Sequence, residues 1–126
     1  VILGSGPNVG TACQAALLLS ESTRYPFVGM SLTQYEHGYK ETAEKAVVIV
    51  INPSKGVLYE RAGKLMDILR NANATVFEIN EPELDEVYSP FTSILPFFFM
   101  AGYLARKLGV GAPFRIGNKI TERPGE

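Results

Sequence analysis

The run AVVIVI at residues 46–51 is the stretch that decides the fold. It holds no polar residue, and five of its six residues are β-branched, which favours a strand. A strand with one solvated face would alternate between apolar and polar residues. An unbroken apolar run is typical of a strand buried on both faces, as in a parallel sheet covered by helices. We therefore expect a central parallel strand here.

Further strands and helices alternate on both sides of this run. The predicted flanking strands are residues 1–3, residues 74–79 and a weaker edge strand at 25–30, where Pro26 cannot donate to a ladder. Apolar residues recur at helical spacing over residues 9–22, 57–69 and 90–108. This alternation predicts an α/β fold: a doubly wound, mostly parallel sheet with helices on both faces, in a flavodoxin-like three-layer sandwich.

Three local signals refine these boundaries. Asn8 is a plausible N-cap for the first helix. Residues 31–44 are polar, with Gly38 as a breaker. Pro96 is expected either to kink the last helix or to mark its restart. Residues 110–126 are rich in Gly and Pro and are expected to form an irregular tail.

Composition excludes several classes of function. With 126 residues, 46% of them hydrophobic, the chain suits one domain with a modest core. The 12 Lys and Arg nearly balance the 13 Asp and Glu, and no basic block is present, so nucleic acid is not an expected partner. The most apolar run, residues 94–105, is too short to cross a bilayer, which takes about 20 residues, so no membrane association is expected.

Cys13 is the single cysteine, which excludes a disulfide framework within the chain and argues against a cysteine-based metal site. We expect no metal and no cofactor, a packed core thiol at Cys13, and a reducing, cytoplasmic setting. The chain opens directly on a predicted strand without an initiator Met, which suggests a domain of a longer protein.

Two glycine-bearing turns are expected at the carboxyl edge of the sheet, where such folds bind ligands. The turn with Gly4, Ser5 and Gly6 resembles a dinucleotide fingerprint, but Val9 stands where the third glycine is expected. A tight strand-to-helix turn is therefore the favoured interpretation. In the second turn, Ser54 and Lys55 are candidates to hold an anion, although turn chemistry alone also explains residues 52–56.

Glu21 and His37 are the candidate acid and base. Glu21 closes an apolar helix, and a carboxylate held against apolar surface has its pKa raised toward the range useful for proton transfer. His37 is the only histidine, and its unperturbed pKa already lies near that range. Such a pair suits proton transfer between adjacent sugar carbons. Without further support, a surface carboxylate and a loop histidine are the ordinary interpretations.

Four motifs in order resemble one family. These are residues 4–7 (GSGP), 15–21 (AALLLSE), 34–38 (QYEHG) and the tail at 113–121. The chain resembles the sugar isomerase (SIS) domain, and specifically the second SIS domain of two-domain proteins such as glucosamine-6-phosphate synthase and the fructosamine-phosphate deglycases. The resemblance covers nearly the whole chain.

The resemblance implies a role for three residues. Glu21 would move a proton between C1 and C2 of an open-chain sugar phosphate, through an enediol or enolamine. His37 would help to open the sugar ring and reach the site of a neighbouring subunit. Lys119, or Asn118 if the alignment slips by one residue, would contact the sugar carbonyl. The implied ligand is a fructose 6-phosphate or glucosamine 6-phosphate type of sugar, in amino sugar metabolism.

Three departures modify what the resemblance implies. Leu18 stands where synthases carry a lysine, and Gln34 replaces a glutamate. The family's phosphate loop of the Ser-x-Ser-Gly-x-Ser/Thr type is absent, as in second domains. We therefore expect residues 1–126 to form a single SIS domain, the C-terminal half of a pair, working as an isomerase, deglycase or aminotransferase-type enzyme.

A helix at 90–108 that is apolar almost all round should be buried all round, which predicts pairing with a second SIS domain or a homodimer. The alternative function is a non-catalytic, sugar-phosphate-sensing SIS module of a regulator.

Overall fold

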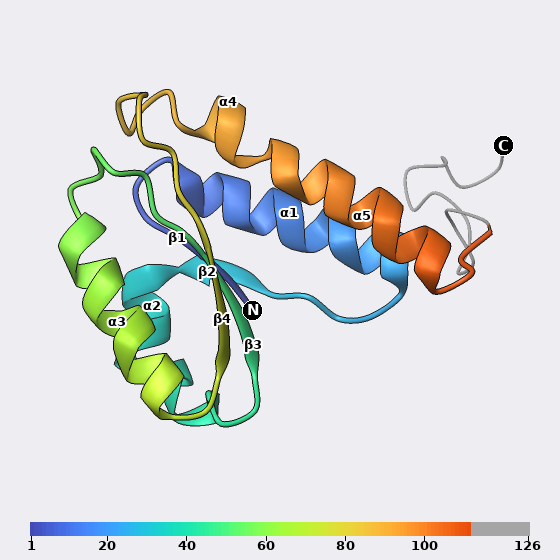
Figure 1. Ribbon diagram of the computed structural model, residues 1–126, viewed down its shortest axis with the longest axis horizontal. Helices are drawn as coiled ribbons and strands as arrows, with labels where there is room; N and C mark the ends of the chain where they lie inside the picture. Colours follow the sequence, from blue (N-terminus) through green and yellow to red (C-terminus); the bar gives the residue numbers. More distant parts are fainter. Residues whose placement is uncertain (112–126) are drawn as a thin grey trace, which may run out of the picture.

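A computed structural model describes residues 1–111 of the chain, and its elements form three layers around one sheet (Figure 1). Four strands lie in the order β2-β1-β3-β4, and every neighbouring pair is parallel. The strands are β1 (Ile2–Gly4), β2 (Gly29–Ser31), β3 (Val47–Ile51) and β4 (Thr75–Ile79). The predicted α/β, doubly wound parallel sheet is confirmed.

Helices cover both faces of this sheet (Figure 1). The helices are α1 (Asn8–Thr23), α2 (Leu32–His37), the 3-10 helix η1 (Tyr39–Thr42), α3 (Tyr59–Asn71), α4 (Pro90–Ser93) and α5 (Leu95–Lys107). Helices α1 and α5 pack with one set of strand residues, and α2 and α3 pack with the other. Within the described range, no helix is long and apolar enough to cross a membrane.

Strand β3 shows why residues 46–51 are apolar throughout. Val48 and Val50 belong to the core under α2 and α3, whereas Ile49 and Ile51 belong to the core under α1 and α5. Successive side chains of a strand point to opposite faces, so a strand covered on both faces needs an apolar residue at every position. The exception is Val47, which is 52% exposed at the start of the strand.

Several local predictions need correction. Asn8 is not the N-cap: Pro7 holds that position with φ −64°, and Asn8 is the first helical residue. A proline already has a helical φ, so the helix begins one residue earlier than a polar cap suggests. Cys13 is exposed, not a core thiol, because the buried stripe of α1 does not include position 13.

The segment before β3 is more ordered than its polar composition suggests. Leu32 and Tyr35 are buried three residues apart, so residues 32–37 form the short helix α2. Gly38 ends this helix, as predicted for a breaker. Pro96 marks a restart, since α4 ends at Ser93 and α5 begins at Leu95 with the proline in its first turn.

Candidate functional site

The two predicted glycine-bearing turns lie next to each other at the carboxyl edge of the sheet. They follow β1 and β3, which are hydrogen-bonded neighbours. Gly4 is glycine because α1 turns back over it: a Cβ there would lie 2.1 Å from the carbonyl oxygen of Asn8. The structure thus brings Gly4, Ser5 and Gly6 to the same edge as Ser54 and Lys55, as the topology predicts.

The acidic loop at residues 80–89, which connects β4 to α4, lies on this edge. Backbone and side-chain groups of the turn after β3 both form hydrogen bonds to this loop. The Ser54 amide donates to the carbonyl oxygen of Glu81 at 2.9 Å, and the Ser54 hydroxyl donates to Asn80 Oδ1 at 3.1 Å. The ammonium group of Lys55 donates to the backbone carbonyl of Glu83. Both residues predicted to hold an anion are therefore engaged by the 80–89 loop.

Glu86, on the same loop, occupies the space between the two turns. Its Oε1 accepts a hydrogen bond from the Ser5 hydroxyl at 3.2 Å, and its Oε2 accepts one from the Val57 amide at 3.1 Å. Sequence reasoning missed this residue. The available signal was four acidic residues directly after a strand whose carboxyl end meets the ligand edge.

Glu81 holds the first half of the 80–89 loop in shape. Its carboxylate accepts hydrogen bonds from the Thr92 hydroxyl at 2.5 Å and from the amides of Glu83 at 2.9 Å and Leu84 at 3.2 Å. The Thr92 hydrogen bond, followed by the two amides, lowers the pKa of Glu81 below its ordinary value, because each bond favours the ionised form. Ionised Glu81 therefore ties the loop to α4.

Glu21 lies far from this edge. It is an exposed residue near the C-terminal end of α1, whereas the Ser5 turn precedes the helix. At a rise of about 1.5 Å per residue, the helix from Asn8 to Glu21 spans about 20 Å. The candidate base and the candidate anion turns of one chain therefore do not share a site.

His37 lies on the other side of the sheet from Glu21. It is the exposed last residue of α2, which belongs to the core under α3, whereas α1 belongs to the core under α5. With the sheet between them, the two residues do not form an acid/base pair within one chain. If they act together, a neighbouring domain has to complete each site.

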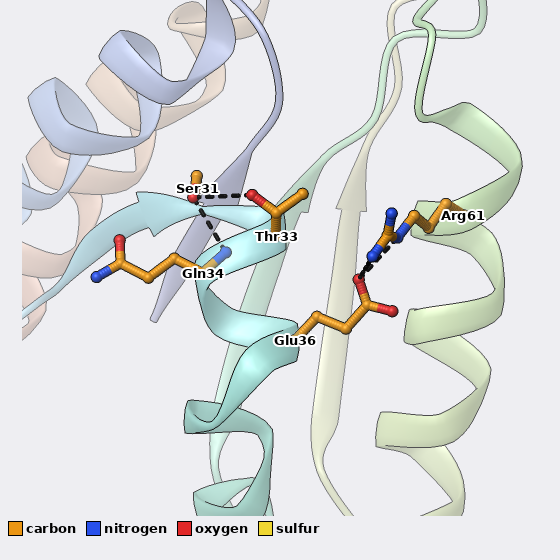
Figure 2. A network of polar contacts seen from close by, with 5 residues as sticks. All are labelled: Ser31, Thr33, Gln34, Glu36 and Arg61. Atoms are coloured by element: carbon orange, nitrogen blue, oxygen red, sulfur yellow. Dashed lines mark hydrogen bonds and ion pairs between the residues drawn. The ribbon is translucent and has the colours of Figure 1, made fainter.

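A polar network holds the helix that carries His37 (Figure 2). At its start, the Ser31 hydroxyl accepts the Gln34 amide at 3.1 Å and lies 3.3 Å from the Thr33 hydroxyl. Near its end, Glu36 pairs with Arg61 of α3 through Nε at 2.8 Å and a terminal nitrogen at 2.7 Å. Two side-chain contacts thus fix a helix of only six residues.

Lys119 and Asn118 lie outside the described residues, as does the tail from residue 112 onward. Within residues 1–111, no three His, Cys, Asp or Glu side chains are grouped in a way that could hold a metal ion.

Two comparisons with known proteins bear on the resemblance. The chain is 27% identical over 118 residues to a glutamine–fructose-6-phosphate aminotransferase (isomerizing) of Thermococcus kodakarensis, in a match covering 82% of the chain. The fold matches that of a phosphosugar isomerase structure from Silicibacter pomeroyi, with a TM-score of 0.72, 20% identity and 86% of the chain covered. The resemblance to an SIS domain is confirmed.

The SIS resemblance comes without a family signature, since no protein-family model matches the chain. The SIS-like chain spans 19% of the length of the aminotransferase and 36% of the phosphosugar isomerase. Both proteins are thus more than twice as long as this chain, and the likeness concerns one SIS-like domain.

Proposed function

We propose that the chain is a sugar-phosphate-binding SIS domain that supplies proton-transfer residues to a site completed by a neighbouring domain. The observation that carries this proposal is the placement of Glu21 and His37. Both are exposed, and they lie on elements that pack on opposite faces of the sheet. Each can therefore serve a site with a neighbour, although the two cannot serve one site within the chain.

The proposed reaction interconverts an aldose and a ketose sugar phosphate, with or without an amino group at C2. Glu21 removes the proton from C2, the electron pair forms the C1–C2 double bond, and the C1 oxygen takes a proton. In the second half, the C2 hydroxyl or amino group gives up a proton and becomes the carbonyl or imine, and the electrons of the C1–C2 double bond take the proton from Glu21 at C1. The proton released at C2 replaces the one that the C1 oxygen took up. Lys119 polarises the carbonyl, and His37 carries the proton that opens the ring of the sugar held by the neighbour. The phosphate group is bound by the partner domain, because this chain lacks the phosphate loop.

The proposed partner surface is the outer face of α4 and α5. Only Phe97 and Ala101 of α5 are buried, so the expectation of burial on every side is not met within residues 1–111. Phe91 and Phe99 are 76% and 79% exposed, and the remaining apolar residues of this face are Leu95, Phe98, Tyr103 and Leu108. An exposed apolar face of this kind marks an interaction site. A second SIS domain, in the same polypeptide or in a homodimer, is the proposed occupant.

Replacement of Glu21 by Gln tests the proposed reaction. In the complete protein, E21Q should lower turnover by about two orders of magnitude or more while leaving sugar-phosphate affinity unchanged, as expected for loss of a general base. Glu60 of α3 is also exposed, and E60Q is the matched control that removes one surface charge. Near-normal turnover of E21Q with fructose 6-phosphate would refute the role of Glu21.

One observation favours the alternative function, a sugar-phosphate sensor. Within the described residues, no hydrogen bond or ion pair orients the side chain of Glu21 or His37, whereas catalytic groups are usually held in place. A sensor requires no proton shuttle. It should bind sugar phosphates without converting them, and E21Q should then leave every measured property intact.

A further inference from the structure

The position of the Glu86 carboxylate calls for a physical explanation. It spans the gap between the turns after β1 and β3, with one oxygen on the Ser5 hydroxyl and the other on the Val57 amide. This is the edge at which folds of this type bind ligands, and a carboxylate is an oxyanion. A protein group with the chemistry of a ligand therefore occupies the ligand edge.

The backbone around Glu86 leaves room for an anion. A Cβ at Gly6 would lie 2.9 Å from Oε1 of Glu86, and Gly6 has φ +48°, a conformation that favours glycine. A Cβ at Gly56 would lie 3.4 Å from the same oxygen and 3.0 Å from the carbonyl oxygen of Pro53. A side chain at position 6 would therefore clash with the carboxylate, whereas at position 56 the closer neighbour is Pro53 and the carboxylate is at ordinary contact distance.

The backbone of Glu86 is held as firmly as its side chain. The Ser89 hydroxyl donates to the carbonyl oxygen of Glu86 at 2.7 Å and accepts from the Asn8 side-chain amide, also at 2.7 Å. Asn8 and Ser89 are both fully buried. The start of α1 therefore positions Glu86, and the carboxylate reaches the two turns without being free to leave by loop motion alone.

We propose that Ser5, Gly6, Gly56 and Val57 form an oxyanion seat, and that Glu86 is its resident anion. The seat, once vacated, binds inorganic phosphate or the phosphate of a sugar phosphate, and Glu86 keeps this edge of the domain closed to both. A tethered carboxylate competes at a high effective concentration, on the order of millimolar or above, so free phosphate at lower concentration is excluded. The choice of a sugar phosphate as the ligand rests on the proposed function. The existence of the oxyanion seat does not depend on it.

The closed seat and the missing phosphate loop have the same consequence: neither leaves a phosphate site on this domain alone. An SIS-like domain with an open anion seat would bind a phosphate at its own edge, in competition with the proposed site shared with a partner. The 80–89 loop accepts a hydrogen bond from each polar side chain of the two turns that the sequence marks as a ligand contact. Ser5 donates to Glu86, Ser54 donates to Asn80, and Lys55 donates to the carbonyl oxygen of Glu83.

Titration of the full chain with inorganic phosphate, followed by amide NMR shifts, tests the proposal. Wild type should bind weakly. E86A should gain at least tenfold in affinity, with shifts at Gly6 and Val57, and E86Q should gain less because its amide still fills the seat. E83Q, which removes a charge from the same loop without vacating the seat, is the control and should match wild type. Adding Ser5→Ala to E86A should reduce the gain, since one donor is lost.

Two outcomes would overturn the proposal. An equal gain in E83Q and E86A would mean that net charge alone sets the affinity. No gain in folded E86A would mean that the carboxylate only holds the loop in place. Where E86A fails to fold, E86Q still has to bind phosphate more tightly than E83Q, and equal affinities of these two variants would overturn the proposal. Neither outcome depends on Glu21 or His37, and E21Q should titrate like wild type, so failure here is distinguishable from failure of the proposed isomerisation.

Discussion

Tyr35→Phe should stabilise the protein. Tyr35 of α2 is fully buried in the core under α3, and within the described residues its hydroxyl has no hydrogen-bond partner. Burial also raises the pKa of this phenol, so the group stays protonated at neutral pH and carries an unpaired donor into the core. Phenylalanine keeps the ring and its packing and removes only the hydroxyl.

The size of the effect follows from this geometry. An unsatisfied buried polar group costs about 1–3 kcal/mol, and the ring volume is otherwise unchanged, so Y35F should raise the free energy of unfolding by about 1 kcal/mol. For a chain of this size that corresponds to an increase in Tm of about 4 °C. The position also lies two residues before His37, so a stabilised α2 should leave the placement of the histidine unchanged.

Urea unfolding monitored by circular dichroism measures the effect through a change in midpoint at constant m-value. Tyr39 lies outside the core and is 51% exposed, so Y39F is the matched control and should change stability by less than about 0.5 kcal/mol. Destabilisation of Y35F by more than about 0.5 kcal/mol would show that the hydroxyl has a partner after all, and the reasoning would fail.

Two further predictions concern the 80–89 loop and the outer face of α5. Hydrogen bonds lower the folded pKa of Glu81, so its contribution to stability is present above its ordinary value of 4.5 and is lost as pH falls through the lower folded pKa. The free energy of unfolding of the wild type, measured as a function of pH, should show this loss, and that of E81Q should not. Identical pH profiles of the two proteins would contradict the role of the carboxylate. F99S should weaken or abolish the association measured by sedimentation. Y25S, which also changes an exposed aromatic residue, is the control and should associate like wild type. Equal association of F99S and Y25S would exclude the outer face of α4 and α5 as the interface.

The layer architecture was predictable because it rests on local patterns. The unbroken run at residues 46–51 requires cover on both faces, and helical periodicity on either side supplies that cover, so a parallel sheet follows. Gly38 ends α2, and Pro96 lies in the first turn of α5, so both residues act through their own backbone chemistry where the sequence places them.

Predictions failed where burial, rather than periodicity, decided the outcome. Residues 32–37 are mostly polar, and only the burial of Leu32 and Tyr35 makes them a helix. Cys13 has small neighbours in sequence but lies outside the buried stripe of α1, with its Sγ 3.7 Å from the carbonyl oxygen of Gly29 in the edge strand β2. Which face of a helix is covered depends on the element that packs against it, and local composition does not contain that information.

The candidate site shows the same division. The meeting of the turns at residues 4–6 and 54–55 was predictable from the sequence, because adjacent parallel strands end at the same edge of a sheet. The position of Glu86 between these turns, and of Glu21 and His37 on opposite faces of the sheet, depends on tertiary packing. Ser5 and Glu86 are 81 residues apart in the chain. Contacts over such separations arise from packing of the whole domain, which no local pattern encodes.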